Sequence, residues 1–132
     1  LFECGNWLRG LVFGMAGAVP IPVIEKREFL SATRKLISDE KRALLVDYLA
    51  YHPTAGDLIP GTGGVRKLRW SLEGRGKRGG ARVVYFYHDP DVPIFALTAY
   101  AKNERADLSQ QDRNDFRKLT ALLVRTFKRT KP

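Results

Sequence analysis

The sequence predicts an α+β fold, in which a small antiparallel β-sheet packs with an N-terminal helical hairpin and a C-terminal helix. Three observations support this prediction. Apolar residues recur at helical spacing in two regions, whereas the middle of the chain contains runs rich in β-branched and aromatic residues. The segments follow one another as strand, helix, helix, strand, strand, strand and helix. With 132 residues, the chain is expected to form one domain, which we place at residues 23–130.

Residues 1–22 differ from the rest of the chain. Residues 11–19 are apolar and small, Arg9 precedes them, and the small residues at 16–18 resemble a signal-peptidase site. The apolar run is short for a secretion signal, and Glu3 lies where such a signal carries positive charge. The run is also far too short for a transmembrane helix. We therefore interpret residues 1–22 as a leader or tail, disordered or dispensable, in preference to a signal peptide.

A short first strand is expected at residues 23–25, followed by two helices. The apolar face of the first helix is formed by Phe29, Ala32, Thr33, Leu36 and Ile37. Ser38 is expected to cap the second helix, whose first turn carries acids that the helix dipole favours. This helix ends at His52, because the residue before Pro53 avoids α geometry. The two helices are predicted to pack as a hairpin.

Residues 54–64, with the sequence TAGDLIPGTGG, are predicted to form a loop. Its glycines Gly61, Gly63 and Gly64 would allow a phosphate to approach the backbone, but no lysine follows in the Walker pattern. A turn that leads into a strand is the favoured interpretation, and a phosphate cradle is the alternative.

Residues 65–87 form the most distinctive stretch of the chain. Basic and apolar side chains alternate over residues 66–70, and β-branched and aromatic residues dominate 81–87, so both runs predict strands. The Gly-rich residues 73–80 are interpreted as a long hairpin connection. Against the single acid Glu73, the hairpin carries seven cations, Arg66, Lys67, Arg69, Arg75, Lys77, Arg78 and Arg82. Because these like charges repel each other, we expect a polyanionic partner.

The apolar run at residues 92–100 predicts another strand, central in the sheet and buried. Ser109 and Asp112 then form a capping box that begins the last helix, with Asp in place of the usual Glu or Gln. One face of this helix is apolar and is formed by Phe116, Leu119, Leu123 and Phe127.

Composition restricts the classes of function. The formal net charge is +9, which favours a nucleic acid, an anionic membrane or an acidic protein as partner. A membrane binder is disfavoured, since no predicted helix joins a strongly basic polar face to a large apolar one. The single cysteine, Cys4, excludes an intrachain disulfide and a cysteine-clustered zinc site and fits a reducing compartment. His52 and His88 lie far apart in sequence, so a histidine-rich metal site is not expected.

Three blocks of sequence resemble one protein family. They are GDLIPGTGGVRKLR at residues 56–69, GKRGGARVVY at 76–85 and YAKNE at 100–104. Together with the order of the elements, their spacing resembles the RelE/ParE superfamily of type II toxin–antitoxin toxins, closest to its HigB branch. The resemblance covers the chain from Val23 to about Lys128.

The resemblance implies a cytoplasmic mRNA endonuclease that acts on mRNA in the ribosomal A site and needs no metal or other cofactor. It also implies a cognate antitoxin, in this branch a HigA-like helix-turn-helix protein, with operator DNA bound only through the toxin–antitoxin complex. No membrane partner is implied.

By position, the resemblance implies a catalytic set of Lys67, Arg69, Arg82 and Lys102. Strand alternation places Lys67 and Arg69 on one sheet face, where Arg82 of the paired strand could meet them. Arginine matches the geometry of phosphate and stays protonated, and lysine can transfer protons where neighbouring cations lower its pKa. We expect Lys67 to transfer a proton, Arg69 and Arg82 to hold the scissile phosphate, and Lys102 to support them.

Contacts to RNA or the ribosome are expected from Arg66, Arg75, Lys77, Arg78 and Tyr100. Some RelE-type enzymes carry a tyrosine near the start of the last helix, where residues 107–110 read DLSQ, so Tyr100 is a candidate substitute. For several of these residues, an interpretation without a functional role stays open. Arg66 could be solvated, the Gly-rich loop merely flexible, and Lys102 only a component of a turn. The alternative functions are a ParE-like toxin that poisons gyrase and a non-catalytic RNA- or ribosome-binding module.

Overall fold

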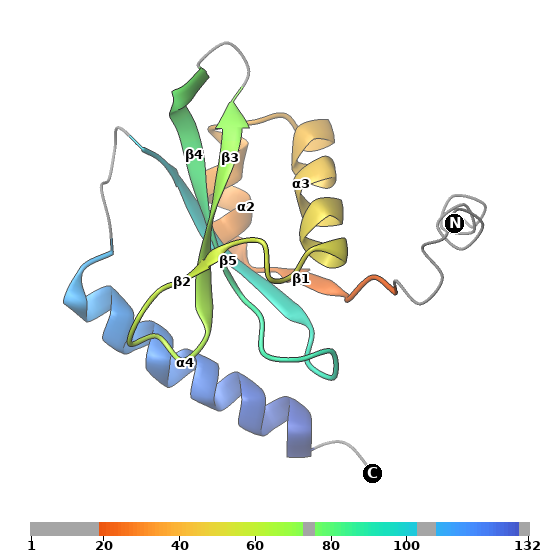
Figure 1. Cartoon of the computed structure of the whole chain (residues 1–132), viewed down its shortest axis with the longest axis vertical. Coiled ribbons are helices and arrows are strands. Elements are labelled where there is room, and N and C mark those ends of the chain that lie inside the picture. The colour runs from red at the N-terminus through yellow and green to blue at the C-terminus, as the bar shows by residue number, and fades with distance from the viewer. Residues whose placement is uncertain (1–18, 73–75, 103–107, 130–132) are drawn as a thin grey trace.

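The structure, a computed structural model, describes residues 19–72, 76–102 and 108–129, with the backbone alone described at 76–79 and 129. It confirms the predicted α+β fold with a helical hairpin near its start and a helix near its end (Figure 1). The elements are β1 (Val23–Glu25), α2 (Arg27–Arg34), α3 (Asp39–Tyr51), β2 (Asp57–Leu58), β3 (Val65–Leu72), β4 (Gly76–Phe86), β5 (Ile94–Ala101) and α4 (Gln110–Arg129).

The five strands form one sheet in the order β1-β5-β4-β3-β2. Strands β2 to β5 pair in antiparallel fashion, as predicted, whereas β1 joins β5 in parallel, with Val23 opposite Ile94. The helical hairpin and the next three strands intervene between β1 and β5, which gives the chain the crossover that a parallel pair needs. The two-residue strand β2 was not predicted, because two residues carry no period.

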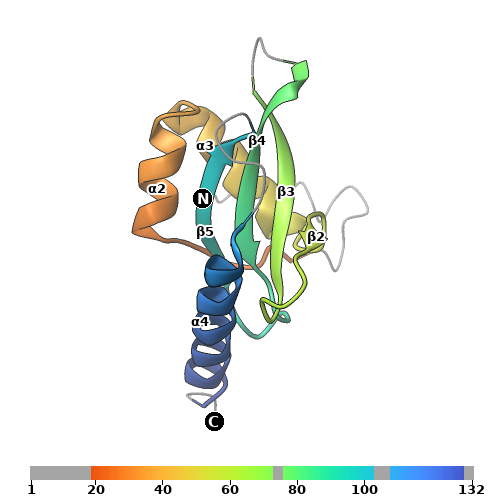
Figure 2. The same cartoon turned by 90° about the vertical axis from the view of Figure 1, so that its left-hand side faces the viewer.

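Helices cover both faces of the sheet (Figure 2). On β4, Val83 and Tyr85 face the core formed with α2 and α3, whereas Val84 and Phe86 face the core formed with α4. A strand buried on both faces is expected to be apolar throughout, which explains the unbroken run in β4 and the predicted burial of β5.

The predicted starts of α3 and α4 are confirmed by their hydrogen bonds, whereas α2 ends at Arg34, so Leu36 and Ile37 lie beyond the helix to which they were assigned. At the start of α3, the hydroxyl of Ser38 accepts the N–H of Lys41 at 3.1 Å. Before α4, the Asp112 N–H donates to Ser109 Oγ at 3.0 Å and the Ser109 N–H donates to Asp112 Oδ2 at 3.2 Å, which is a complete capping box. Helix α3 ends one residue before His52. Among the described residues, no helix has the length and apolarity required to cross a bilayer.

The Gly-rich connection between β3 and β4 is shorter than predicted. We expected it to span residues 73–80, but β4 begins at Gly76, which pairs with Leu72 across an irregularity in β3. Glycine weakens a strand but can adopt its extended backbone, so strand pairing can continue through a sequence that is typical of a loop. The connection is thereby reduced to residues 73–75, outside the described residues.

The loop before β3 is held by the buried hydroxyl of Tyr85. This hydroxyl donates to the Pro53 carbonyl at 2.8 Å and accepts the Gly56 N–H at 2.8 Å. The Gly56 carbonyl in turn accepts from Arg66 Nη1 at 2.7 Å. A Cβ at Gly56 would lie 2.9 Å from the Tyr85 ring, so this position requires glycine. The network fixes where β2 begins.

The second half of the same loop forms a turn that packs against α4. Thr62 Oγ1 donates to the Ile59 carbonyl at 2.7 Å and accepts the N–H of Val65 at 3.1 Å. Gly63 has a φ of 79°, and a Cβ there would lie 2.5 Å from Thr120 Oγ1 of α4. The glycine is thus explained by the turn and by close packing, which supports the turn interpretation over a phosphate cradle.

Helix α4 is attached to the domain at several points. Thr120 Oγ1 donates to the Thr62 carbonyl at 3.0 Å, and the Phe127 ring meets Phe95 edge-on at 5.6 Å. Near its end, Lys128 Nζ lies 2.6 Å from Asp89 Oδ2, and this ammonium lowers the pKa of Asp89 below its usual value. These contacts fix the position of α4 on the sheet. They thereby also determine which part of the sheet α4 leaves uncovered.

The hydroxyl of Tyr85 should be the main polar contribution to the stability of the loop. Tyr85→Phe leaves the buried Gly56 N–H without its acceptor, so we expect the free energy of unfolding to fall by about 1–3 kcal/mol in denaturant titrations. Tyr87→Phe is the matched control, because this half-buried hydroxyl on the same chain segment makes no hydrogen bond within the described residues. Its effect should stay within about 0.5 kcal/mol.

The same comparison has a defined pH dependence. Burial raises the pKa of Tyr85 above its ordinary value of 10.0, so the unfolded chain loses this proton at lower pH than the folded one. Below the ordinary pKa of 10.0, the hydroxyl makes its full contribution to the free energy of unfolding. This contribution is lost as the pH rises through the raised pKa of the folded protein. The stability difference between wild type and Tyr85→Phe should be constant below the ordinary tyrosine pKa of 10.0 and shrink as the pH rises above it. A difference that also stays constant above this pKa would contradict this assignment.

Candidate functional site

The register of the sheet places three of the predicted site residues in one row. Arg69 of β3 lies directly opposite Arg82 of β4, and Arg82 lies directly opposite Tyr100 of β5. Directly opposite residues of antiparallel strands project to the same face. Arg82 is two residues from Val84 in β4, so both side chains project to the same face of the sheet. Val84 lies in the core formed with α4, so this is the face that α4 covers farther along the strands.

Helix α4 covers only the far end of this face. Figure 2 shows α4 across the lower part of the sheet, whereas the part of β3 and β4 that leads to the hairpin tip rises above it. In agreement, Arg69 is exposed and Lys67 is half-buried. Arg69 therefore lies on a part of the face that α4 leaves open, whereas Arg82 and Tyr100 of the same row are buried.

Arg82 is the most enclosed cation of the row, with 8% of its surface exposed. Its Nη1 donates to the Ala81 carbonyl at a long 3.4 Å, and Tyr100 beside it is 6% exposed. The directly opposed Arg69 carries the same charge, and like charges at facing positions of a sheet are destabilising. An anion bound between two such arginines would relieve their repulsion. The planar donor set of a guanidinium group matches phosphate.

Lys67 lies two residues before Arg69 on the same face, as predicted. Its Cα partner across the β2–β3 pairing is Asp57, and directly opposite residues project to the same face of a sheet. Sequence reasoning missed Asp57, because its position depends on the two-residue strand β2. The pairing makes Asp57 a candidate for orienting the Lys67 ammonium.

Lys102 lies at the same end of the sheet as the row. It follows β5 in a turn, its side chain is exposed, and its N–H donates to the Gly80 carbonyl at 3.2 Å. Gly80 is two residues from Arg82 along β4. The structure thus brings Lys102 to the border of the row. The backbone of Lys102 takes part in the turn that follows β5.

Arg66 belongs to a different part of the molecule from the other predicted site residues. It alternates with Lys67 and projects to the opposite face, where Nη1 donates to the carbonyls of Gly56 and Thr54 at 2.7 and 3.4 Å. It is therefore separate from the row. Its predicted contact with RNA stays a prediction.

The remaining sequence predictions are placed as follows. Arg75 lies outside the described residues, and Lys77 and Arg78 lie in β4 with only their backbone described. His88 lies beyond the opposite end of β4, 3.6 Å from Asp89, and so is remote from Arg82. Within the described part of the chain, no group of three or more His, Cys, Asp or Glu side chains is placed to hold a metal ion.

The model of the family described as the RelE toxin of the RelE/RelB toxin–antitoxin system matches residues 23–130. The matched range begins at the first residue of β1 and includes all eight elements of the structure.

Removal of the exposed member of the facing arginine pair should stabilise the free protein. For Arg69→Gln we expect the free energy of unfolding to rise by about 0.2–1 kcal/mol at low ionic strength, because the repulsion with Arg82 is removed. At about 1 M salt the gain should become smaller, since salt at this concentration screens charges beyond about 3 Å, although a partly buried pair is screened less than an exposed one. Lys118→Gln on α4, which removes the same charge at another exposed position, controls for net charge. Destabilisation by Arg69→Gln, or a gain equal to that of the control, would contradict the pairing.

Proposed function

This chain belongs to the RelE toxin family of toxin–antitoxin systems, and from this premise we propose that it is an endonuclease that cleaves mRNA during translation. The observation that carries the proposal is the row in which the exposed Arg69 lies opposite the enclosed Arg82, with Tyr100 beside it. We further propose that the enzyme depends on the ribosome, needs no metal and belongs to the HigB branch. The three sequence blocks that resemble this branch support the last point.

The proposed reaction is attack of a ribose 2′-oxygen on the adjacent phosphorus. A bond forms between the 2′-oxygen and phosphorus while the bond from phosphorus to the 5′-oxygen breaks. A base accepts the proton of the 2′-hydroxyl, and an acid gives a proton to the departing 5′-oxygen. Negative charge grows on the non-bridging oxygens in the transition state, so fixed positive donors aimed at them lower the barrier.

In this proposal the two arginines serve the phosphate. Arg82 is held within the sheet and offers a fixed guanidinium, whereas Arg69 is exposed and can adjust to the substrate from the facing strand. A phosphate between them would neutralise the repulsion of the free protein. Lys67, on the same face, transfers a proton, with Asp57 orienting its ammonium group.

The other predicted residues take supporting roles. Lys102, at the border of the row, offers a second contact to the RNA backbone, and Tyr100 shapes the pocket beside Arg82 or stacks on a base. The hairpin cations Arg75, Lys77 and Arg78 contact RNA phosphates. Since its guanidinium binds the loop, Arg66 is the least direct of the proposed contacts.

Membership of the family implies an antitoxin as partner. We propose a HigA-like helix-turn-helix protein in this role, with operator DNA bound by the complex and not by this chain alone. A ParE-like action on gyrase is the second candidate function, and it would leave translated mRNA uncut.

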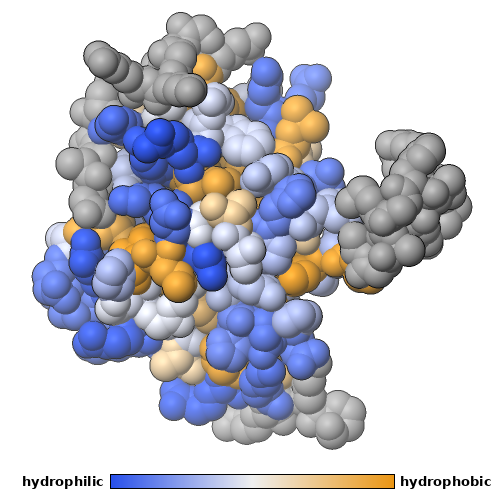
Figure 3. Space-filling view, in the orientation of Figure 1, coloured by the Kyte–Doolittle hydropathy of each residue, from blue (hydrophilic) through white to orange (hydrophobic). Residues whose placement is uncertain are grey.

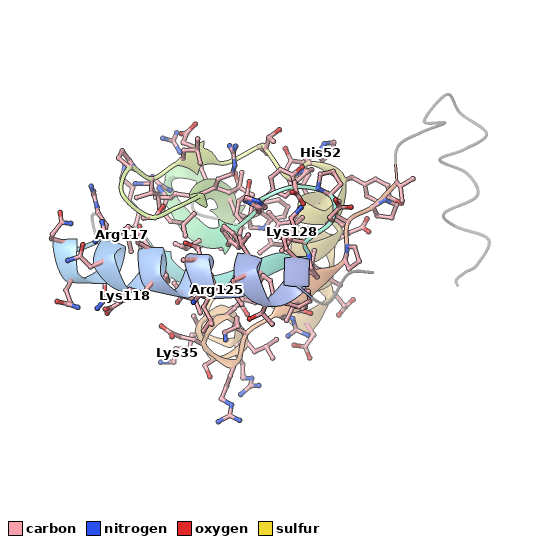
Figure 4. All side chains as sticks on the ribbon, turned by 90° about the horizontal axis from the view of Figure 1, so that it is seen from below. Lys35, His52, Arg117, Lys118, Arg125 and Lys128 are labelled. Atoms are coloured by element: carbon pink, nitrogen blue, oxygen red, sulfur yellow. The ribbon has the colours of Figure 1, made fainter. Side chains whose placement is uncertain are left out.

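Primer extension in a cell-free translation reaction should reveal cuts within translated codons. We expect Arg69→Ala and Arg82→Ala each to slow cleavage by roughly 10²–10³-fold, since each removes a donor to the charged transition state. Arg69 is exposed, so its variant should fold normally, whereas the Arg82 variant requires a check of its folding by circular dichroism. Arg125→Ala, an exposed position on α4 (Figure 4), is the matched control and should cleave like wild type.

The outcomes separate the candidate functions. A folded wild-type protein that makes no cuts and leaves translation undisturbed would overturn the nuclease proposal and direct attention to gyrase. Blocked translation without cuts would favour a non-catalytic ribosome-binding module. Equal losses in the Arg125 control would mean that general RNA affinity, not the row, sets the rate.

A further inference from the structure

Strand β2 is the smallest element of the sheet, and its own side chains do little to hold it there. Asp57 and Leu58 are both exposed, Leu58 to 59%. Figure 3 shows hydrophilic and hydrophobic side chains beside one another on the side of the molecule where β2 and β3 lie. A strand that buries so little apolar surface opens easily unless the segments beside it are anchored. After β2, the buried Ile59 provides such an anchor, because its N–H donates to the Val65 carbonyl at 2.9 Å.

Before β2, Gly56 is anchored through both of its backbone groups. Its N–H donates to the Tyr85 hydroxyl at 2.8 Å, and its carbonyl accepts from Arg66 Nη1 at 2.7 Å. Arg66 of β3 and Tyr85 of β4 lie directly opposite each other in the sheet, so their side chains project to the same face. We call Gly56, Arg66 and Tyr85 the Gly56 clamp.

The surroundings of Arg66 are those of a cation that serves the protein itself. Its side chain is half-buried, and its Nε is buried without a hydrogen-bond partner among the described residues. Its Nη1 also donates to the Thr54 carbonyl at 3.4 Å. Burial is the main cause of the raised pKa of Tyr85, and the charge of Arg66 opposes it, so the guanidinium lies near the buried hydroxyl. Arg66 is thus directed at the loop, on the face of the sheet opposite Arg69.

The clamp directly precedes Asp57, the Cα partner of Lys67. Hydrogen-bonded pairs alternate with non-bonded ones along an antiparallel ladder. Since Ile59 is bonded to Val65, Asp57 and Lys67 form the next bonded pair. Gly56 also packs on the same strand, because a Cβ added to it would lie 3.1 Å from the carbonyl carbon of Lys67. The clamp therefore determines where β2 meets the backbone of Lys67.

We propose that Arg66 is a positioning residue, which holds β2 and with it Asp57 at the proton-transfer residue Lys67. The role of Lys67 in this proposal rests on the proposed function. Arg66 then acts within the protein, in place of the contact to RNA that the sequence predicts. A small misplacement of reacting groups slows a reaction strongly, even when its cause lies outside the chemistry. Loss of the clamp should therefore slow the chemical step and leave the binding of RNA unchanged.

Cleavage of mRNA on programmed ribosomes, measured over a range of toxin concentrations, separates positioning from binding. Arg66→Met should lower the maximal rate by about tenfold or more and change the half-saturating concentration by less than about twofold. Arg66→Lys should lie between the Met variant and wild type, because its ammonium group can still donate to a loop carbonyl. Arg125→Met, at an exposed position on α4, is the matched control and should leave both values unchanged.

Tyr85→Phe removes the other half of the clamp and gives an independent test. Tyr85 is buried, so its hydroxyl cannot touch RNA. This variant should lower the maximal rate as Arg66→Met does, whereas Tyr87→Phe should cleave like wild type. A wild-type maximal rate in either clamp variant would overturn the proposal. A higher half-saturating concentration for Arg66→Met with an unchanged maximal rate would instead assign Arg66 to RNA binding.

Amide hydrogen exchange on the free protein tests the attachment of β2 without any cleavage. The Lys67 amide is directed at β2, whereas strand alternation directs the Leu68 amide at β4. Arg66→Met should speed exchange of the Lys67 amide by about tenfold or more and leave the Leu68 amide unchanged. Unchanged exchange at Lys67, or equal acceleration at Leu68, would show that Arg66 does not act through β2. A wild-type protein that makes no cuts would refute the nuclease, while exchange would still decide whether Arg66 holds β2.

Discussion

The pairing of β3 with β4 places Arg69 directly opposite Arg82, and the rest of the candidate site depends on this constraint. Facing like charges destabilise a sheet, and an anion between them would relieve the repulsion. The same register aligns Tyr100 with Arg82 across β4, and alternation brings Lys67 to the same face. A shift of one residue in the pairing would send these side chains to the opposite face, into the core formed with α2 and α3.

Two buried contacts keep the surroundings of this register in place. Tyr85, on the helical-hairpin side of β4, holds the loop that carries Asp57 to Lys67. On the other side, the turn at Thr62 accepts a hydrogen bond from Thr120 and so fixes the part of the sheet that α4 covers. The open part of the face is therefore a consequence of packing on both sides of the sheet.

Much of this arrangement could be predicted from the sequence, because it depends on local rules. Helical periodicity and capping residues predicted the hairpin and the last helix, and the two-residue spacing of Lys67 and Arg69 predicted their common face. The rest depends on pairings that no local pattern encodes. The short β2 is formed by tertiary contacts, so its Asp57 was missed, and the parallel attachment of β1 follows from a crossover. Gly76 to Gly80 were assigned to a loop by composition, although their backbone continues a strand. The hydrogen bonds of Arg66 could not be foreseen, since charge alone does not distinguish a structural cation from a ligand-binding one.

The central claim is that Arg69 and Arg82 act on one phosphate, and a double-mutant cycle on the cleavage rate tests it most directly. Cleavage would be measured for wild type, Arg69→Ala, Arg82→Ala and the double variant in the same translation reaction. Groups that hold the same phosphate are coupled, so the double variant should be about tenfold or more faster than the product of the two single losses predicts. If the loss of cleavage rate in the double variant equals the product of the losses in the two single variants, the two arginines act at separate places. The proposed site would then be wrong.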